Sequence, residues 1–299
     1  MEFGESESPL VVTGLGHVDQ GPTGALCDPQ PYLRNPKLRK FMGLQDELAI
    51  VAAGLAVEQA HLNDVPRDRI GLYWTTGYVP FERDDLKSLA EAATDESSGE
   101  LSMKALSTVG YHAINGLLTF RCLPNMPVFH ISMNLNLQGP YYVSYPGPGQ
   151  WYVAFQRACD ALHSGTIDVA LIGGVADQRN ALVQHHFSRL QHPPAGDTLR
   201  NAAGCFVMER QLSAARRDCT PRAILDGVSV AYRPFDPFHT ECEPSEEFST
   251  GIAPEMLLTL GPASLAIALS QVAGTIRGQF RHQISTRDGF QAESTWRLP

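Results

Sequence analysis

Residues 141–175 read YYVSYPGPGQWYVAFQRACDALHSGTIDVALIGGV and predict a strand, a helix and a second strand in succession. After the Pro-Gly pairs, apolar residues recur at the spacing of a helix with one buried face: Trp151, Ala154, Phe155, Ala158 and Leu162. Gly165 ends this helix, and Asp168–Gly174 is an apolar strand, as expected where helices cover both faces of a sheet. Strand, helix and strand in this order indicate a parallel crossover unit and an α/β fold.

Upstream of this unit, strands and helices alternate. A short β-branched run, Leu10–Gly14, predicts a buried strand that leaves through a tight turn at Gly14-Leu15-Gly16. The other predicted elements are an amphipathic helix at Asp46–Leu62, a strand at Ile70–Gly77, a polar surface segment at Asp84–Gly99, an apolar helix at Ala105–Arg121 and a strand at Val128–Ser132.

Downstream, the chain holds strands, one loop and one helix. We expect strands at Gly204–Glu209 and Arg222–Tyr232, a loop at Arg233–Pro254, a helix of small residues at Gly261–Arg277, and a terminal hairpin at His282–Leu298 around Asp288-Gly289.

Composition and charge narrow the class of protein. A chain of 299 residues with 43% hydrophobic residues can bury a large core. The net charge of -9 argues against binding the phosphate backbone of nucleic acids. The first residues, MEFGESESPL, lack the pattern of a signal peptide, and no apolar run reaches bilayer length, so we expect a cytoplasmic protein without a membrane segment. The six scattered cysteines lack metal-ligand spacing, and we expect neither metal nor cofactor.

Four segments, taken in order, resemble the β-ketoacyl synthases. They are VVTGLG at Val11–Gly16, NMPVFHISMNLNLQGP at Asn125–Pro140, HSGTIDVALIGGV at His163–Val175 and NAAGCFVMER at Asn201–Arg210. The resemblance implies a thiolase-like layered α-β-α-β-α fold with an intact N-terminal half, residues 1–210, and a shortened C-terminal half, residues 211–299.

In this family the nucleophilic cysteine lies where a strand turns sharply into a helix. Counted without gaps from Gly139-Pro140 and from Gly173-Gly174, that position is occupied by Pro148. A condensing enzyme needs a thiolate there, activated at a helix N-terminus. Proline has no nucleophile, and it has no N–H to stabilise an oxyanion, but it is tolerated in the first turn of a helix. The resemblance therefore implies a nucleophile position that is degenerate.

The two histidines that the family uses also lack clear counterparts. The nearest match to one histidine motif is LLTLGP at Leu257–Pro262, which places Leu258 at the histidine position. An apolar side chain can neither donate a hydrogen bond nor carry a proton. For the other histidine the only candidate is His239, whose surroundings do not match the motif.

Other interpretations of the turn remain open. Pro146–Gly149 is also the composition of an ordinary tight turn. Chain-length-factor subunits resemble ketosynthases with glutamine in place of the cysteine, and Gln150 would take that place if the turn held a compensating insertion and deletion. Together with Tyr145, the residues Trp151 and Tyr152 are candidates for lining or plugging the former substrate tunnel, or for a dimer surface.

Several side chains that could take part in catalysis or metal binding are better explained by structural roles. We interpret Cys159 as a packing cysteine, since it shares a helical face with Ala158 and Leu162. Asp168 at the start of a buried strand is expected to serve as a turn or cap residue. The pair His185-His186 suits a helix surface, because no third metal ligand is in view.

The sequence thus predicts a non-catalytic, chain-length-factor-like subunit. It would pair with an active ketosynthase in type II polyketide or fatty-acid-like biosynthesis and work with an acyl carrier protein; homodimerisation is not excluded. One alternative is an enzyme that reuses the fold as a hydrolase, acyltransferase or decarboxylase of carrier-bound acyl groups, with Ser144, Tyr145, Gln150 and His239 as weak candidates for its chemistry; the other is a homodimeric scaffold. We also expect the shortened half to leave apolar strands uncovered and the isolated chain to be poorly soluble.

Overall fold

The fold was analysed in a computed structural model, which describes residues 8–20, 27–79, 83–95, 97–190, 193–233, 245–248, 259–286 and 289–299. The N-terminal elements are β1 (Leu10–Gln20), η1 (Gln30–Tyr32), η2 (Pro36–Phe41), α1 (Leu44–Ala60), η3 (Leu62–Asp64), η4 (Arg67–Arg69), β2 (Ile70–Thr76), α2 (Arg83–Ala93), α3 (Met103–Thr108), η5 (Gly110–Ala113), α4 (Leu118–Cys122), α5 (Met126–Leu135) and β3 (Tyr141–Ser144).

The remaining elements begin with the helix of the quoted crossover. They are α6 (Pro148–His163), β4 (Val169–Asp177), α7 (Ala181–Phe187), β5 (Asn201–Arg210), α8 (Gln211–Arg216), β6 (Ala223–Tyr232), β7 (Ser245–Phe248), η6 (Gly261–Ala263), α10 (Ser264–Val272), β8 (Gly278–Ser285) and β9 (Phe290–Leu298).

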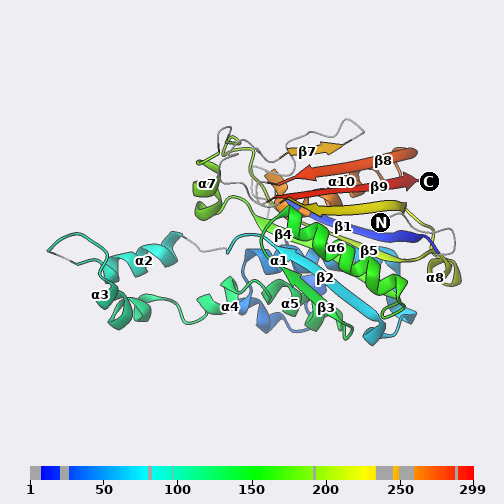
Figure 1. The fold of residues 1–299 in the computed structure, drawn as a ribbon. Helices are drawn as coiled ribbons and strands as arrows, with labels where there is room; N and C mark the ends of the chain where they lie inside the picture. The colour runs from blue at the N-terminus through cyan, green and yellow to red at the C-terminus, as the bar shows by residue number, and fades with distance from the viewer. Residues whose placement is uncertain are drawn as a thin grey trace.

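Within the described residues, nine strands form one mixed sheet in the order β3-β2-β4-β5-β1-β6-β9-β8-β7 (Figure 1). β2 runs parallel to β3 and β4, which confirms the crossover, and the other neighbouring strands are antiparallel. The sheet has two parts, which we call the N-terminal half-sheet (β3, β2, β4, β5, β1) and the C-terminal half-sheet (β6, β9, β8, β7). They meet only where Leu10–Val12 pairs with Ala223–Leu225, so the join is short.

One face of the N-terminal half-sheet is covered by α1 and α5. Gly14 and Gly16 allow this close packing, because a Cβ atom at either position would collide with a backbone carbonyl of α1, that of Ala56 or that of Ala52. The predicted tight turn at these glycines is therefore wrong. The strand continues to Gln20 after a register shift between Val12 and Gly14.

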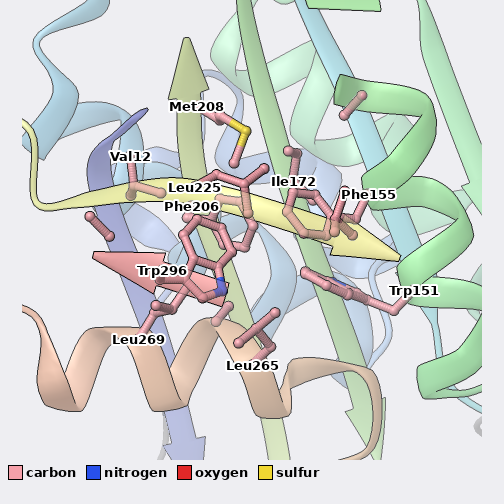
Figure 2. Packing of buried hydrophobic residues seen from close by; sticks show 14 of the residues in the cluster. Val12, Trp151, Phe155, Ile172, Phe206, Met208, Leu225, Leu265, Leu269 and Trp296 are labelled. Atoms are coloured by element: carbon pink, nitrogen blue, oxygen red, sulfur yellow. The ribbon is translucent and has the colours of Figure 1, made fainter. Parts of the chain in front are cut away.

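The helices α6 and α10 form the central layer. α6 contacts β2, β3 and β4 on one side and β6, β8 and β9 on the other, while α10 packs on β1 and β5. The larger hydrophobic core lies between α6 and α10. In this core Phe155 stacks on Trp296, and Phe206 meets both rings edge-on (Figure 2). The apolar stripe that predicted this helix is thus buried between the two half-sheets.

The outward face of the C-terminal half-sheet is polar. Arg281 of β8 pairs with Glu293 of β9 at 2.7 Å, and Arg297 of β9 pairs with Asp226 of β6 at 2.7 Å. In the described part of the chain no helix covers this face. The predicted layered fold with a shortened C-terminal half is confirmed, but the expectation of uncovered apolar strands is wrong, because the strands alternate apolar-in and polar-out.

Two local predictions in the N-terminal half are corrected. Val128–Ser132 is part of the helix α5, because buried positions over the longer run recur at helical spacing and Pro127 suits the first turn. The predicted helix Ala105–Arg121 is broken into α3, η5 and α4.

Two predictions in the C-terminal half are adjusted. The predicted loop Arg233–Pro254 contains the strand β7. The terminal hairpin is present as β8 and β9, although Asp288 lies outside the described residues.

A segment that we call the arm, residues 83–122, projects from the body (Figure 1). Its elements α2, α3 and η5 pack on one another, and α4 packs on α5. Large apolar side chains are exposed on it, namely Leu101, Met103, Val109, Tyr111 and Phe120. Among the described residues, no helix has the length and apolar character needed to cross a bilayer.

Candidate functional site

The first turn of α6 begins where β3 ends, at the carboxyl edge of the parallel strands. Gly147 turns the chain with a φ of 97°, which glycine adopts without strain. Pro148 is the first residue of the helix, and the first helical hydrogen bond there runs from the Trp151 N–H to the Gly147 carbonyl at 3.2 Å. The sequence predicts that Pro148 lies at the start of a helix, and the structure confirms this.

Close packing surrounds this helix start. A Cβ atom at Gly149 would lie 2.6 Å from the ring of Phe290, so the first residue of β9 lies directly against the turn. Cys159, three turns further along α6, is fully buried, and burial raises the pKa of its thiol. It is a packing residue, as predicted.

Ser144 and Gln150 are brought together by the same turn. The Ser144 hydroxyl lies 2.6 Å from the Thr75 hydroxyl and donates to the Gln150 carbonyl at 3.1 Å. These contacts tie the end of β3 to the first turn of α6. The hydrogen bonds described for this hydroxyl are to a hydroxyl and a carbonyl, and neither is a general base that could make it a nucleophile.

Trp151 and Tyr152 are buried within the chain itself, with 2% and 1% exposed surface. Trp151 packs against Phe155 and Phe206. The Tyr152 hydroxyl lies 2.7 Å from Nδ1 of His282 and 2.8 Å from the Ser294 hydroxyl, and the Trp296 indole N–H donates to that hydroxyl. His282, Ser294 and Trp296 were not singled out in the sequence, because residues on an alternating strand carry no signal of what they will face.

Tyr145 behaves differently from its neighbours on α6. Its side chain is 39% exposed and lines a small opening that is continuous with solvent, together with Gln45, Asp46, Arg121, Cys122 and Pro127. Its ring also meets that of Tyr78 edge-on at 6.5 Å. The predicted residues therefore separate into a buried pair, Trp151 and Tyr152, and one residue beside a pocket.

A buried acid and a buried imidazole adjoin this pocket. Asp46, in the first turn of α1, accepts a hydrogen bond from the Gly43 N–H at 2.7 Å, and burial raises the pKa of its carboxyl group to about 8. Nε2 of His130 on α5 lies 4.0 Å from Asp46 Oδ2, and among the described residues neither ring nitrogen of His130 has a hydrogen-bond partner. Burial lowers the pKa of His130 to about 4. The sequence did not reveal this pair, because His130 was assigned to a predicted strand.

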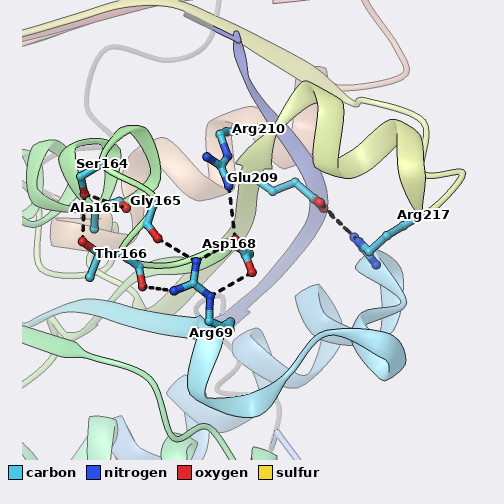
Figure 3. A network of polar contacts seen from close by, with 9 residues as sticks. All are labelled: Arg69, Ala161, Ser164, Gly165, Thr166, Asp168, Glu209, Arg210 and Arg217. Carbon is cyan, nitrogen blue, oxygen red and sulfur yellow. Dashed lines mark hydrogen bonds and ion pairs between the residues drawn. The ribbon is translucent and has the colours of Figure 1, made fainter.

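Asp168 has the structural role that was expected. Its carboxylate accepts two hydrogen bonds from Arg69, at 2.9 and 3.0 Å, and lies 3.2 Å from Arg210 (Figure 3). Arg69 also donates to the carbonyls of Gly165 and Thr166, so the cluster holds the turn between α6 and β4. The hydrogen bonds from Arg69 lower the pKa of Asp168, which keeps it an anion and not an acid catalyst.

A second ion pair, between Glu209 and Arg217, is buried at the end of β5 (Figure 3). Glu209 also accepts from the Thr13 hydroxyl at 2.8 Å, and Arg217 donates to the carbonyls of Ala60 and His61 at the end of α1. This pair therefore joins β1, β5 and α1.

The remaining candidates are the histidine pair on α7 and two residues that the structure does not describe. His185 and His186 lie in the last turn of α7, and the described residues contain no group of His, Cys, Asp and Glu side chains able to hold a metal. Leu258 and His239 lie outside the described residues.

The layered α/β architecture, with α6 beginning at the carboxyl edge of the parallel strands, defines a thiolase-like protein of the ketosynthase class. The chain belongs to the β-ketoacyl synthase family: residues 16–200 match the family model described as beta-ketoacyl synthase, N-terminal domain. A search of curated proteins gives no match.

Solved structures with a similar fold include ketosynthases and complexes that contain them. One is the structure "AntDE:AntF (apo): type II PKS acyl-carrier protein in complex with its ketosynthase bound to the hexaketide", with a TM-score of 0.72, 14% identity and coverage of 98% of this chain and 100% of that chain. At the same coverage, the ishigamide ketosynthase/chain length factor gives a TM-score of 0.66 at 14% identity. A β-ketoacyl synthase from Burkholderia phymatum STM815 gives 0.65 at 12% identity, again at 98% and 100% coverage. At these identities the similarity concerns the fold.

Proposed function

We propose that this chain is a non-catalytic, chain-length-factor-like subunit that pairs with an active ketosynthase in type II polyketide or fatty-acid-like biosynthesis. The observation that carries the proposal is Pro148 at the first position of α6. In an active relative a thiolate at this helix start would receive the acyl chain. Proline offers neither the sulfur nor a backbone N–H for the oxyanion.

The packing around α6 supports a loss of the reaction with retention of the scaffold. The hydroxyl network of Ser144 fixes the turn, and Trp151 and Tyr152 fill the space beneath it with buried aromatic rings. We propose that these two rings plug the inner end of the former acyl tunnel. The half-buried Gln150 and the exposed Tyr145 lie toward the outside and would line what remains of it.

The free edge of the N-terminal half-sheet supports a partner subunit. β3 is paired with β2 on one side and ends the sheet on the other. Such an edge is a template for pairing with another chain. Tyr141 on β3 and Phe129 on α5 are 69% and 49% exposed, and the arm adds further exposed apolar side chains. An active ketosynthase packing on this face would cover them.

A local basic segment supports a role for an acyl carrier protein. The chain carries a net charge of -9, yet four exposed basic side chains fall within seven residues: Arg34, Lys37, Arg39 and Lys40. We call these residues the basic strip. Its backbone is anchored, since the Arg34 N–H donates to the Asn134 side chain at 3.0 Å and Asn35 accepts from the Lys37 N–H at 3.1 Å. An acidic carrier protein would be attracted to it, although the overall charge gave no such indication.

Co-expression with an active ketosynthase, followed by size-exclusion chromatography, tests the proposal. We expect a one-to-one complex, and condensation that requires both chains. Independent elution of the two proteins would contradict the proposal. Turnover of acyl-carrier substrates by this chain alone would instead support the alternative of an enzyme with new chemistry on the old fold.

A further inference from the structure

The buried pair of Asp46 and His130 lies at the base of the arm. The pocket beside Asp46 is lined by Val79, the last described residue before the arm, by Arg121 and Cys122 at the end of the arm, and by Leu123 directly after it. Gly43, whose N–H binds the Asp46 carboxyl group, is packed against Arg121, because a Cβ atom at Gly43 would lie 3.2 Å from the Arg121 carbonyl. The first turn of α1 is thus in direct contact with the returning end of the arm.

The groups that face Asp46 come from every neighbouring element. On α1 they are the Gly43 N–H and the next residue, Glu47, which disfavours a second negative charge. From α5 comes His130, whose imidazole has no hydrogen-bond partner at either nitrogen. Across the pocket lies Arg121 of α4. Gln45 is already engaged, since its amide donates to the Tyr78 carbonyl at 2.8 Å.

We propose that Asp46 and His130 form a proton-linked lock at the base of the arm. When Asp46 is protonated, the first turn of α1 packs against α4 and α5 without intervening water. When Asp46 loses its proton, water enters through the pocket and the wall formed by Arg121–Leu123 moves outward.

The physical reason is the cost of a buried charge for which the described residues supply one hydrogen bond, from the Gly43 N–H, and no paired cation. A carboxylate in a dry interior must gain hydrogen bonds or become protonated again. His130 remains neutral where Asp46 titrates, because its own pKa is lowered to about 4, so it cannot neutralise the carboxylate. Among the described residues that line the pocket, the cationic side chain is that of Arg121, which lies on the arm itself. Ionisation of Asp46 therefore acts on the segment that moves.

The native thiol of Cys122 in the pocket wall reports this movement. Alkylation by iodoacetamide is measured at pH 6 and pH 9 by peptide mass spectrometry, relative to Cys219, which is half-buried beside the Ala60 carbonyl at the other end of α1. Between these pH values we expect the ratio of the Cys122 rate to the Cys219 rate to rise at least about threefold in the wild type. In Asp46→Asn, which mimics the protonated acid, we expect it to stay flat.

The matched control is Glu47→Gln, a loss of charge at the next position, which removes one cause of the raised pKa of Asp46 but keeps its carboxyl group, so the ratio should still rise between pH 6 and pH 9. If the ratio of the Cys122 rate to the Cys219 rate stayed flat in the wild type, the lock would be overturned even if Asp46→Asn did not fold. Equal rises of this ratio in the wild type and in Asp46→Asn would also overturn it. The measurement uses this chain without a ketosynthase. The lock does not rest on the proposed function, so the lock and the pairing can fail separately.

Discussion

The hydroxyl of Tyr152 lies 2.7 Å from Nδ1 of His282, and the two rings stack with their centroids 5.7 Å apart and their planes inclined by 14°. Tyr152 belongs to α6, one turn after Pro148, and His282 belongs to β8. Ser294 on β9 completes the contact at 2.8 Å from the same hydroxyl. The helix that begins at Pro148 is therefore fastened to the C-terminal half-sheet by a buried polar network.

Replacing Tyr152 by Phe should destabilise the protein by about 1–3 kcal/mol, because it leaves buried polar atoms of this network without a partner. Urea unfolding followed by circular dichroism measures the change. Tyr145→Phe is the control, since the Tyr145 side chain is partly exposed and should contribute little. Equal stabilities of Tyr152→Phe and the wild type would show that the network does not fasten α6.

Replacing Pro148 by Cys tests whether the missing sulfur alone explains the loss of chemistry. We expect no condensation and no decarboxylation of a malonyl carrier substrate by this variant, because the proposed function assigns Leu258 to the position of a histidine that would assist. Pro148→Ala should leave complex formation with a ketosynthase unchanged. Turnover by Pro148→Cys on its own would mean that the remaining site is intact, contrary to the proposed function.

The sequence predicted the crossover unit because its apolar stripe and its apolar strand have clear periods. It failed at Val128–Ser132, where two β-branched residues outweighed the longer helical spacing of α5. It failed at Gly14-Leu15-Gly16 because glycine in a strand can indicate either a tight turn or the close approach of another element. Here it serves close approach by α1 and not a turn, and only the packed helix distinguishes the two.

The candidate site could be predicted in part. The place of Pro148 in the first turn of a helix and the buried state of Cys159 followed from the sequence, whereas the assignment of Pro148 to the nucleophile position stays a prediction. The pairing of Asp46 with His130 could not be predicted, because it depends on how α1 and α5 cross, and a side chain 84 positions away carries no local signal. The basic strip was hidden in the same way by an overall charge of the opposite sign.

The ion pair of Glu209 and Arg217 should contribute far more to stability than the exposed pair of Arg281 and Glu293. Glu209 is fully buried, and Arg217→Met would leave its charge without its cation. We expect a loss of about 3 kcal/mol or more in the free energy of unfolding. Glu293→Gln should change it by less than about 1 kcal/mol, because its partner Arg281 is half-exposed. Similar losses in both variants would contradict this assignment.

Charge reversal in the basic strip should weaken binding of an acidic holo acyl carrier protein. The variant Lys37→Glu/Lys40→Glu is compared by titration calorimetry with Lys87→Glu/Lys104→Glu, which reverses two charges on the arm. We expect at least about a tenfold loss of affinity in the first variant and a weaker salt dependence, since screening acts on exposed charges. Equal affinities for both variants would remove the strip from the carrier interface.

Substitution of the partner-facing side chains should separate assembly from folding. Tyr141→Glu and Phe129→Glu each place a charge on the exposed face of β3 and α5, and we expect either to abolish co-elution with the ketosynthase, because a charge buried in an interface without a partner is costly. Leu212→Glu, at an equally exposed apolar residue on α8, is the matched control and should still co-elute. Retained co-elution of all three variants would place the interface elsewhere.

The pH dependence of stability should change when Asp46 is replaced by Asn. Burial raises the pKa of Asp46 from 3.8 to about 8 in the folded chain, so the stability it contributes is fully present below its unfolded pKa and is lost as the pH rises through about 8. Asp46→Asn removes this loss, since the amide stays neutral. We therefore expect the free energy of unfolding of Asp46→Asn, relative to the wild type, to increase between pH 5 and pH 9 by on the order of 2–5 kcal/mol. Glu47→Gln, at the neighbouring position, should not reproduce the increase. Parallel pH profiles for the wild type and Asp46→Asn in urea unfolding would mean that Asp46 is ionised in the folded protein at neutral pH, and that the carboxylate has a partner in solution.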